Sequence, residues 1–325
     1  MTIDQLYKYA YIKKPLDEVY PDISLVPDEF IIEWLKDTFD YERIHSSCVS
    51  GGGESLMNPV TPELCEKLNN GGIEVGLITN GSLFNSKNIP ILVKNCKWIG
   101  ISMDAATEET YSKTKGIEGK LLNKVCENIK LLVKEVNKLN IDNGICFKFL
   151  LTPNNYNEIY DSVVLAKSLG VHDYHLRPVG YEGVSKLKGQ CLEYTPEMLE
   201  SINRQMEEAM KLETDNFKVY GIRHKFTSNF QPRKNFSKCW TIPLLPTFGA
   251  DGIVHYCFDI RGRGGTEMCK HYPDVTEISR FWNSQKHKDM VNNFDVKSCT
   301  KCTFSQYNEV VENVFINDDM YREFI

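Results

Sequence analysis

The sequence has 325 residues, a formal net charge of −6 and 42% hydrophobic residues. A chain of this length can bury one large core, or a large and a small one, which indicates an α/β domain with an appendage. The acidic balance and the lack of basic runs argue against nucleic-acid and anionic-membrane partners. The start shows no charged-then-apolar leader and no window approaches a membrane span, so we expect a cytoplasmic protein acting on small molecules or proteins.

Strand and helix patterns alternate through the first half of the chain. Apolar residues repeating every 3.6 positions predict helices, and short apolar runs bounded by turn residues predict strands. We expect strands at 46–50, 72–81, 97–105, 144–152 and 173–178, and helices at 28–39, 61–69, 87–95, 119–139, 157–169 and 195–212. Strands separated by single helices form right-handed βαβ units, which give a parallel sheet, either open or curled into a barrel.

Polar residues or glycines follow each of these strands. The five strand ends are Gly51–Glu54, Thr79–Gly81, Ser102–Asp104, Thr152–Asn154 and Arg177–Pro178. The carboxyl ends of parallel strands meet at one edge of the sheet, where α/β proteins bind their ligands. Loops usually begin with polar residues, which is enough to explain any single polar strand end. Five polar strand ends at the same edge of the sheet favour a shared cleft.

The glycine run from Gly51 to Gly53, followed by Glu54, indicates that another group approaches this backbone closely. Glycine loses more conformational freedom on folding than any other residue, so three in a row beside a strand are unfavourable without a reason. The run matches neither the P-loop nor the G-x-G-x-x-G pattern, and a carboxylate there would repel phosphate. Bare backbone groups beside an acid suit a ligand that carries an ammonium, such as an amino acid or its derivative.

Four motifs follow successive strands between about residues 45 and 180. They read VSGGGESLMNP, LITNG, ISMDAATEETYSKTKG and LLTPNNYNEI. In order and spacing they resemble the cofactor-binding core of radical S-adenosylmethionine (radical SAM) enzymes. The resemblance implies a partial (β/α)6 TIM-like barrel, missing its first strand, that binds SAM at its open end.

The same resemblance implies a set of cofactor-binding residues, which are Gly52, Gly53, Glu54, Ser102, Asp104 and Arg177. The glycines and the glutamate would hold the amino group of SAM. The serine and the aspartate would lie near its ribose or carboxylate. The arginine would meet the cofactor carboxylate or the substrate, with a structural salt bridge as the alternative.

The cysteines fall into two groups. Scattered single cysteines usually behave as small buried hydrophobes, and we expect this of Cys48, Cys65, Cys96, Cys126, Cys146 and Cys191. In the last quarter, two pairs of thiols suit one tetrahedral zinc or one cubane cluster. These are Cys239, Cys257, Cys299 and Cys302. Spacing alone leaves zinc and iron-sulfur open, since C-x-x-C serves both; Cys269 is a spare thiol or a substitute ligand.

The spacing C-x12-G-x4-C, with Gly252 as its glycine, resembles the start of a SPASM or twitch domain. The resemblance implies a hairpin turning at the glycine, a helix before the C-x-x-C, and an auxiliary [4Fe-4S] cluster on the four cysteines. No cysteine follows Cys302, as in the twitch form with one cluster. We therefore expect a barrel at 1–180, a connecting helical segment at 181–238 and the metal-binding domain at 239–325.

Radical SAM enzymes carry a C-x-x-x-C-x-x-C loop for the catalytic cluster, but this sequence has no cysteine before Cys48. Either the reading frame starts at an internal methionine of an ordinary radical SAM enzyme, or the chain has lost reductive SAM cleavage. The intact glycine run favours the first. The resemblance then implies SAM cleavage to a 5′-deoxyadenosyl radical, hydrogen abstraction from a peptide or small polar substrate, and an electron donor such as flavodoxin or ferredoxin.

Two other classes remain open. One is a non-catalytic binding or accessory protein that uses the cleft and the four-cysteine metal module to hold a partner. The other is a metal-independent barrel enzyme with a zinc staple, for which Glu54 or Asp104 would be the general acid or base.

Overall fold

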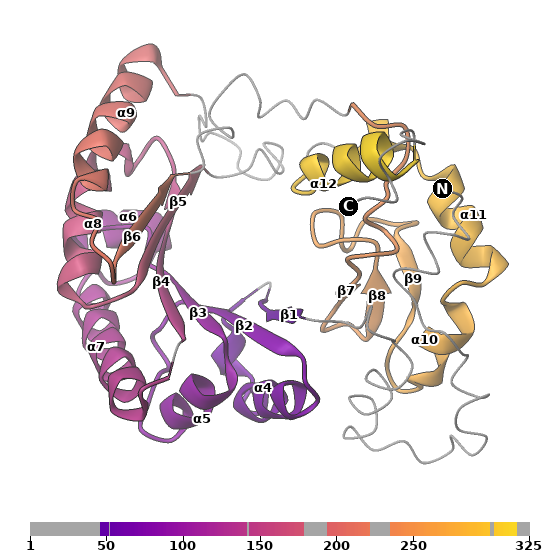
Figure 1. Ribbon diagram of the computed structural model, residues 1–325, viewed down its shortest axis with the longest axis horizontal. Helices are drawn as coiled ribbons and strands as arrows, with labels where there is room; N and C mark the ends of the chain where they lie inside the picture. The colour runs from indigo at the N-terminus through magenta and orange to yellow at the C-terminus, as the bar shows by residue number, and fades with distance from the viewer. Residues whose placement is uncertain are drawn as a thin grey trace. The chain divides into compact units, whose positions relative to one another are not determined.

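The computed structural model describes residues 46–51, 53–141, 143–178, 194–221, 235–299 and 302–316. The chain divides into two compact units, and we call Ser46–Ser228 the barrel unit and the part from Asn229 onward the cysteine unit (Figure 1). The helix expected at 28–39, Cys191 and Gly52 lie outside the described residues. No described helix has the length and hydrophobicity that a membrane crossing requires.

The barrel unit contains a parallel sheet of six strands in the order β1-β2-β3-β4-β5-β6. The strands are β1 (Ser46–Val49), β2 (Glu74–Thr79), β3 (Trp98–Ser102), β4 (Gly144–Leu151), β5 (Asp173–Pro178) and β6 (Lys218–Gly221). The connecting helices are η1 (Ser55–Met57), α4 (Thr61–Asn70), α5 (Asn88–Asn95), α6 (Glu108–Lys115), α7 (Leu121–Leu139), η2 (Tyr156–Glu158), α8 (Ile159–Ser168) and α9 (Pro196–Met210).

The elements predicted between residues 46 and 178 are all present, and α9 matches the helix expected at 195–212. Helix α6 and strand β6 were not predicted. Strand β6 pairs in parallel with β5, so the sheet continues beyond the boundary expected at residue 180.

Helices cover one face of the sheet, and the core lies between the two layers. Figure 1 shows α4, α5, α7, α8 and α9 along the outer side of the strands. Helix α7 buries the stripe that its sequence predicts, including Val125, Ile129 and Leu132. Strand β4 turns Phe147 and Phe149 toward these helices, and both are fully buried.

Alternate residues point to the opposite face, which we call the inner face. Side chains alternate along a strand, so the residues between the buried ones face away from the helices. On β3, β4 and β5 the inner face carries Trp98, Gly100, Ser102, Cys146, Lys148, Leu150, Asp173, His175 and Arg177. It is much more polar than the face that the helices cover.

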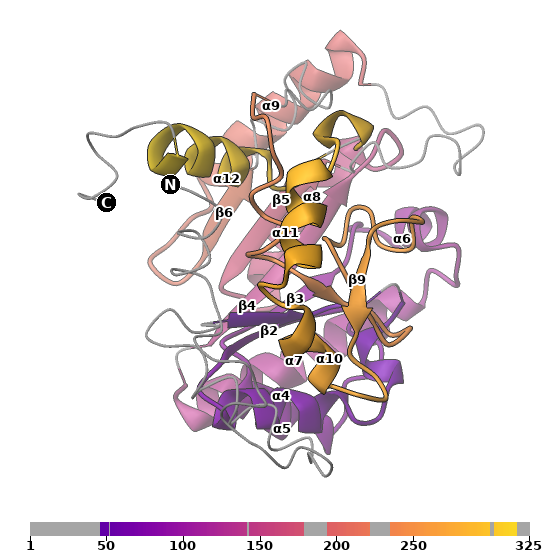
Figure 2. The same cartoon turned by 90° about the vertical axis from the view of Figure 1, so that its right-hand side faces the viewer.

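The cysteine unit is built on a small antiparallel sheet of β7 (Thr247–Phe248), β8 (Ile253–His255) and β9 (Glu267–Lys270). The expected hairpin is present, and it turns at Gly252 with a φ of 79° that favours glycine. Its helices are α10 (Thr276–Phe281), α11 (Gln285–Asn293), η4 (Val296–Ser298), α12 (Ser305–Val310) and the π-helical turn η5 (Val311–Ile316) (Figure 2). Helices α10 and α11 precede the C-x-x-C segment, as the sequence predicts.

Candidate functional site

A cavity of about 200 Å³ opens at the carboxyl ends of β1, β2 and β3. Its lining consists of Ser50, Gly51, Gly53, Glu54, Ile78, Thr79, Asn80 and Ser102. It lies where parallel sheets place their ligands. Among the predicted cofactor residues, the structure thus gathers Gly53, Glu54 and Ser102 around one space.

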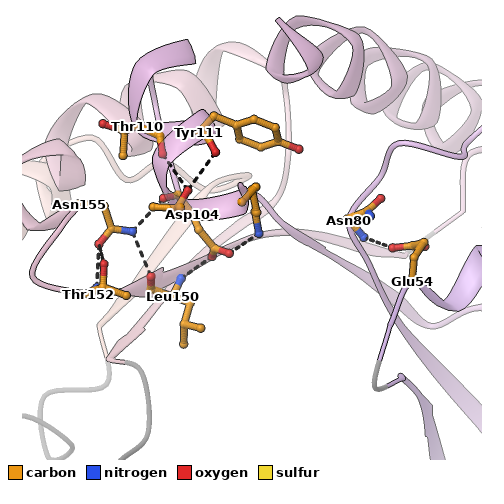
Figure 3. Close-up of polar contacts among 10 residues, drawn as sticks. Glu54, Asn80, Asp104, Thr110, Tyr111, Leu150, Thr152 and Asn155 are labelled. Atoms are coloured by element: carbon orange, nitrogen blue, oxygen red, sulfur yellow. Dashed lines mark hydrogen bonds and ion pairs between the residues drawn. The ribbon is translucent and has the colours of Figure 1, made fainter. Parts of the chain in front are cut away.

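Glu54 is held by three hydrogen bonds within the chain. Its Oε1 accepts from the Leu56 N–H at 3.0 Å and from the Thr79 hydroxyl at 2.5 Å. Its Oε2 accepts from the Asn80 N–H at 2.6 Å, the contact drawn in Figure 3. A carboxylate offers about four lone-pair sites, so one is left for a ligand donor. Glu54 therefore ties the glycine loop to the end of β2 as well as facing the cavity.

No packing contact among the described residues explains why position 53 lacks a side chain. A methyl group added there would meet no atom within 4 Å, and its φ is not in the left-handed region. At Gly51 an added methyl would lie 3.3 Å from the Gly53 carbonyl oxygen, which is a tight contact. The fold requires little of the glycine at position 53, so close approach of a ligand is the better explanation for it.

Asp104 has a structural role at the end of β3. It adopts a φ of 60°, and its Oδ1 accepts from the Leu150 N–H at 2.6 Å (Figure 3). Its Oδ2 pairs with the Lys115 ammonium, and its carbonyl accepts from Asn155 Nδ2 at 2.8 Å. The carboxylate is thus neutralised and bound. Asp104 is not part of the cavity lining, unlike its predicted companion Ser102.

A second buried carboxylate, which the sequence did not point to, fixes the loop that follows Asp104. Glu158 is 8% exposed and accepts from the Ala106 N–H at 2.7 Å and from the hydroxyls of Thr107 and Thr110 at 2.6 Å each. It thereby holds the first turn of α6, where a negative charge is favoured. The partners lie about fifty residues apart, so no local pattern indicated them.

Arg177 lies apart from the cavity. It is exposed on the inner face of β5, opposite Leu150 in the sheet register. Strand β4 separates it from Ser102 on β3. The structure does not bring this arginine together with the other predicted cofactor residues.

The four candidate metal ligands pack against one apolar cluster of the cysteine unit. Cys239 is buried, and Cys257, Cys299 and Cys302 are half-buried. Burial raises the pKa of Cys302 to about 12, with the nearby thiols of Cys239 and Cys299 contributing. Burial also raises the pKa of Cys257 to about 12, with Cys239 again contributing. Cys239 is therefore within electrostatic reach of Cys257 and Cys302, and Cys299 is within reach of Cys302.

These thiols are near one another without being closed around a common point. Among the described residues, no three His, Cys, Asp or Glu side chains are gathered tightly enough to hold a metal ion. Four half-buried or buried thiols on one small unit nevertheless form a donor set that suits zinc or an iron-sulfur cluster.

A polar clasp holds Cys239 close to Cys302. Asn308 of α12 is fully buried, and its Oδ1 accepts from the backbone N–H groups of Trp240 and Thr241 at 2.6 Å and 3.1 Å. Its Nδ2 also approaches the Cys302 sulfur at 3.8 Å. One turn later, the Glu312 carboxylate accepts from the Trp240 indole N–H at 2.7 Å. The segment around Cys239 is thereby fastened to the helix that follows Cys302.

The remaining cysteines follow the expected pattern with one exception. Cys65, Cys96, Cys126 and Cys146 are buried. Cys48 is exposed on β1, contrary to expectation, because this strand lies at the edge of the sheet that the described residues form, and half of its residues are exposed. Cys269, the fifth thiol of the cysteine unit, lies half-buried on β9.

Residues 9–160 match the Radical SAM superfamily. The chain is 26% identical over 140 residues to a probable GTP 3',8-cyclase of Saccharolobus islandicus, covering 42% of each protein. It is 27% identical over 129 residues to an AdoMet-dependent heme synthase of Methanosarcina barkeri, covering 39% of this chain and 35% of that protein. The match thus spans less than half the length of these curated relatives.

Solved structures share the fold at low sequence identity. Streptococcus suis SuiB bound to S-adenosylmethionine superposes with a TM-score of 0.60 at 14% identity, covering 87% of this chain and 66% of SuiB. Native anSMEcpe with bound AdoMet gives a TM-score of 0.55 at 16% identity, covering 88% of this chain and 80% of that one. The family match and the shared fold agree that residues 9–160 carry a radical SAM domain, the domain of a superfamily of enzymes.

Proposed function

We propose that the cavity at the ends of β1, β2 and β3 binds the methionine end of SAM. Gly52, Gly53 and Glu54 would surround the ammonium group, and Ser102 would lie near the ribose or the carboxylate. The bare backbone at Gly53 carries this proposal, because the protein itself leaves the space beside it open. The free lone pair of the Glu54 carboxylate is the natural acceptor for an ammonium.

Within this site, the residues of the chain orient and enclose the cofactor. The three hydrogen bonds of Glu54 fix the loop against β2 before any ligand arrives, so little ordering is needed on binding. Asp104, held by Leu150 and Lys115, would set the position of the neighbouring Ser102 instead of touching the cofactor. Arg177 would serve the substrate side of the inner face.

When bound beside a reduced [4Fe-4S] cluster, SAM supplies hydrogen abstraction by a radical, chemistry that belongs to the cofactor. The sequence contains no C-x-x-x-C-x-x-C pattern, so no residue of the chain is assigned to that cluster. We propose a peptide or a small polar molecule as substrate and a flavodoxin or ferredoxin as electron donor. Support for a peptide comes from SuiB, which has been solved bound to its precursor peptide SuiA.

We further propose that Cys239, Cys257, Cys299 and Cys302 hold an auxiliary [4Fe-4S] cluster in a twitch-like module. The hairpin at Gly252, the helices before the C-x-x-C segment and the clasp by Asn308 support it. Anaerobic reconstitution with iron and sulfide should load about four irons per chain. Tight zinc binding with no uptake of iron would refute the cluster assignment.

The proposed SAM site predicts a dependence on the ammonium group. Equilibrium dialysis with labelled SAM should show saturable binding of one SAM per chain. L-methionine should compete for the site, whereas 3-methylthiopropionate, which keeps the carboxylate and lacks the ammonium, should compete at least about tenfold less well. Equal competition by the two compounds would show that Glu54 does not receive the ammonium.

A further inference from the structure

Lys148 is a cation on the inner face of the sheet that no described residue neutralises. It lies between Phe147 and Phe149 on β4, which are buried on the helical side, so its own side chain points to the inner face. In the described part of the chain its side chain forms no ion pair or hydrogen bond, and its ammonium lies 5.1 Å from the centroid of the Trp98 ring.

Two glycines create the path that Lys148 follows across the sheet. A methyl group on Gly100 would lie 2.2 Å from Lys148 Cε, so the lysine stem occupies the space that the glycine on β3 leaves open. A methyl group on Gly76 would lie 2.3 Å from the Trp98 ring, so the glycine on β2 lets the indole lie flat beneath the ammonium. The lysine, the indole and the two glycines form one continuous layer on the inner face.

This layer lies on the same face of the sheet as the cavity and adjoins its lining along the strands. Lys148 is opposite Ser102 in the sheet register, and Ser102 lines the cavity. The charge of Lys148 also reaches the exposed Cys48 on β1, where it opposes the rise in thiol pKa that desolvation by nearby protein atoms causes. Cys48 lies two residues before the cavity residue Ser50, so in an extended chain the two side chains point the same way. The ammonium therefore lies on the same inner face as the cavity, on the side toward the amino ends of the strands.

Arg177 is a second cation on this face. His175 on β5 is opposite Lys148 in the register, and burial and the charge of Lys148 lower its pKa, so its ring is neutral near pH 7. Arg177 follows two residues later, about 7 Å further toward the carboxyl edge. The acid of this strand, Asp173, is at the opposite end of β5. On β4 and β5 the inner face is thus positive toward the edge where the cavity opens.

Packing alone gives a weak reason for this arrangement. The cation–π contact is favourable, but ordering a long side chain and partly desolvating an ammonium both oppose it. Methionine would fill the same channel without a charge to desolvate. An unneutralised ammonium beside a ligand cavity is instead suited to an anion that arrives with the ligand.

We propose that Lys148 binds a carboxylate or phosphate group of the substrate, next to SAM on the inner face of the sheet. This inference rests on the proposed function for the place of SAM. The substrate is accordingly an anionic molecule or a peptide with an acidic side chain or terminus. Trp98 holds the ammonium in position until the anion binds, and Gly100 keeps the channel open.

The test uses the full chain and two probes, inorganic phosphate followed by ³¹P NMR titration and SAM followed by equilibrium dialysis. Lys148→Met removes the charge and keeps the stem, and Lys148→Arg keeps the charge. Lys138→Met, at an exposed lysine of α7, is the matched control for loss of one charge. We expect Lys148→Met to weaken phosphate binding at least about tenfold, and Lys148→Arg and the control to bind phosphate nearly as well as wild type.

SAM binding separates this inference from the proposed function. We expect all of these variants to bind SAM as wild type does. Loss of SAM affinity in Lys148→Met, parallel to the loss of phosphate affinity, would assign the lysine to the carboxylate of SAM and overturn the inference. Phosphate binding that is absent in wild type or unchanged in Lys148→Met would also overturn it. Phosphate binding through Lys148 without SAM binding would support the anion site and refute the proposed cofactor.

Discussion

The hydrogen bonds of Glu54 predict that this residue stabilises the fold before it binds any ligand. In Glu54→Gln, the amide NH₂ replaces the oxygen that accepts from Asn80 at 2.6 Å, so two donors face each other. The bonds from Leu56 and Thr79 would also lose their charged acceptor. A hydrogen bond to a charged group contributes about 1.5–3 kcal/mol, and because Glu54 is only half-buried we expect a loss of about 2–3 kcal/mol.

Thermal unfolding measured by circular dichroism checks this magnitude. For a unit of this size, 1 kcal/mol shifts Tm by about 2–4 °C, so Glu54→Gln should lower the Tm of the barrel unit by about 4–12 °C. Glu63→Gln is the matched control. Glu63 forms an exposed ion pair with Lys67 at 3.4 Å, and because exposed ion pairs contribute little, its loss should change stability by less than about 0.5 kcal/mol. Equal Tm values for the two variants would show that the Glu54 carboxylate does not fasten the glycine loop.

Three further predictions concern packing, pH and metal retention. Gly76→Ala should destabilise the barrel unit by about 1–3 kcal/mol, because its methyl would lie 2.3 Å from the Trp98 ring. Urea unfolding measures this loss, and an unchanged midpoint would show that Trp98 does not pack against Gly76. Burial lowers the pKa of His287 from 6.5 to about 4, so the unfolded state alone takes up the proton as the pH falls through this window. The cysteine unit should therefore lose roughly 3 kcal/mol of stability between those pH values, a loss that His287→Phe should abolish. Asn308→Ala should retain clearly less iron after reconstitution than Asn293→Ala, an exposed control, because it releases Trp240 and Thr241, and equal iron contents would refute the clasp.

Local periodicity predicted most of the barrel unit. Helix α7 and strand β4 are long and strongly patterned, since each buries one face against the other layer, and their bounds agree with the sequence to within a few residues. Strand β6 was missed because its four residues carry no pattern of their own and are held by pairing with β5. Helix α6 was missed because its surface is largely polar.

The site was predicted in position more than in detail. The order of strand ends placed Gly53, Glu54 and Ser102 at one edge, because parallel strands leave no other arrangement. The partners of these residues come from distant parts of the chain, as with Thr79 for Glu54 and Glu158 for the loop after β3. Only folding brings such groups together, so spacing could not show that Asp104 is engaged by Leu150 and Lys115.

The central claim is that SAM binds in the cavity beside Gly53. It is tested most directly by measuring both the SAM affinity and the free energy of unfolding of Gly53→Val. The space around Gly53 is open in the protein, so the valine should change the free energy of unfolding by less than about 0.5 kcal/mol. It should lower SAM affinity at least about tenfold, because its branched side chain would fill the space proposed for the methionine end. A variant that is equally stable and binds SAM as tightly as wild type would contradict the account.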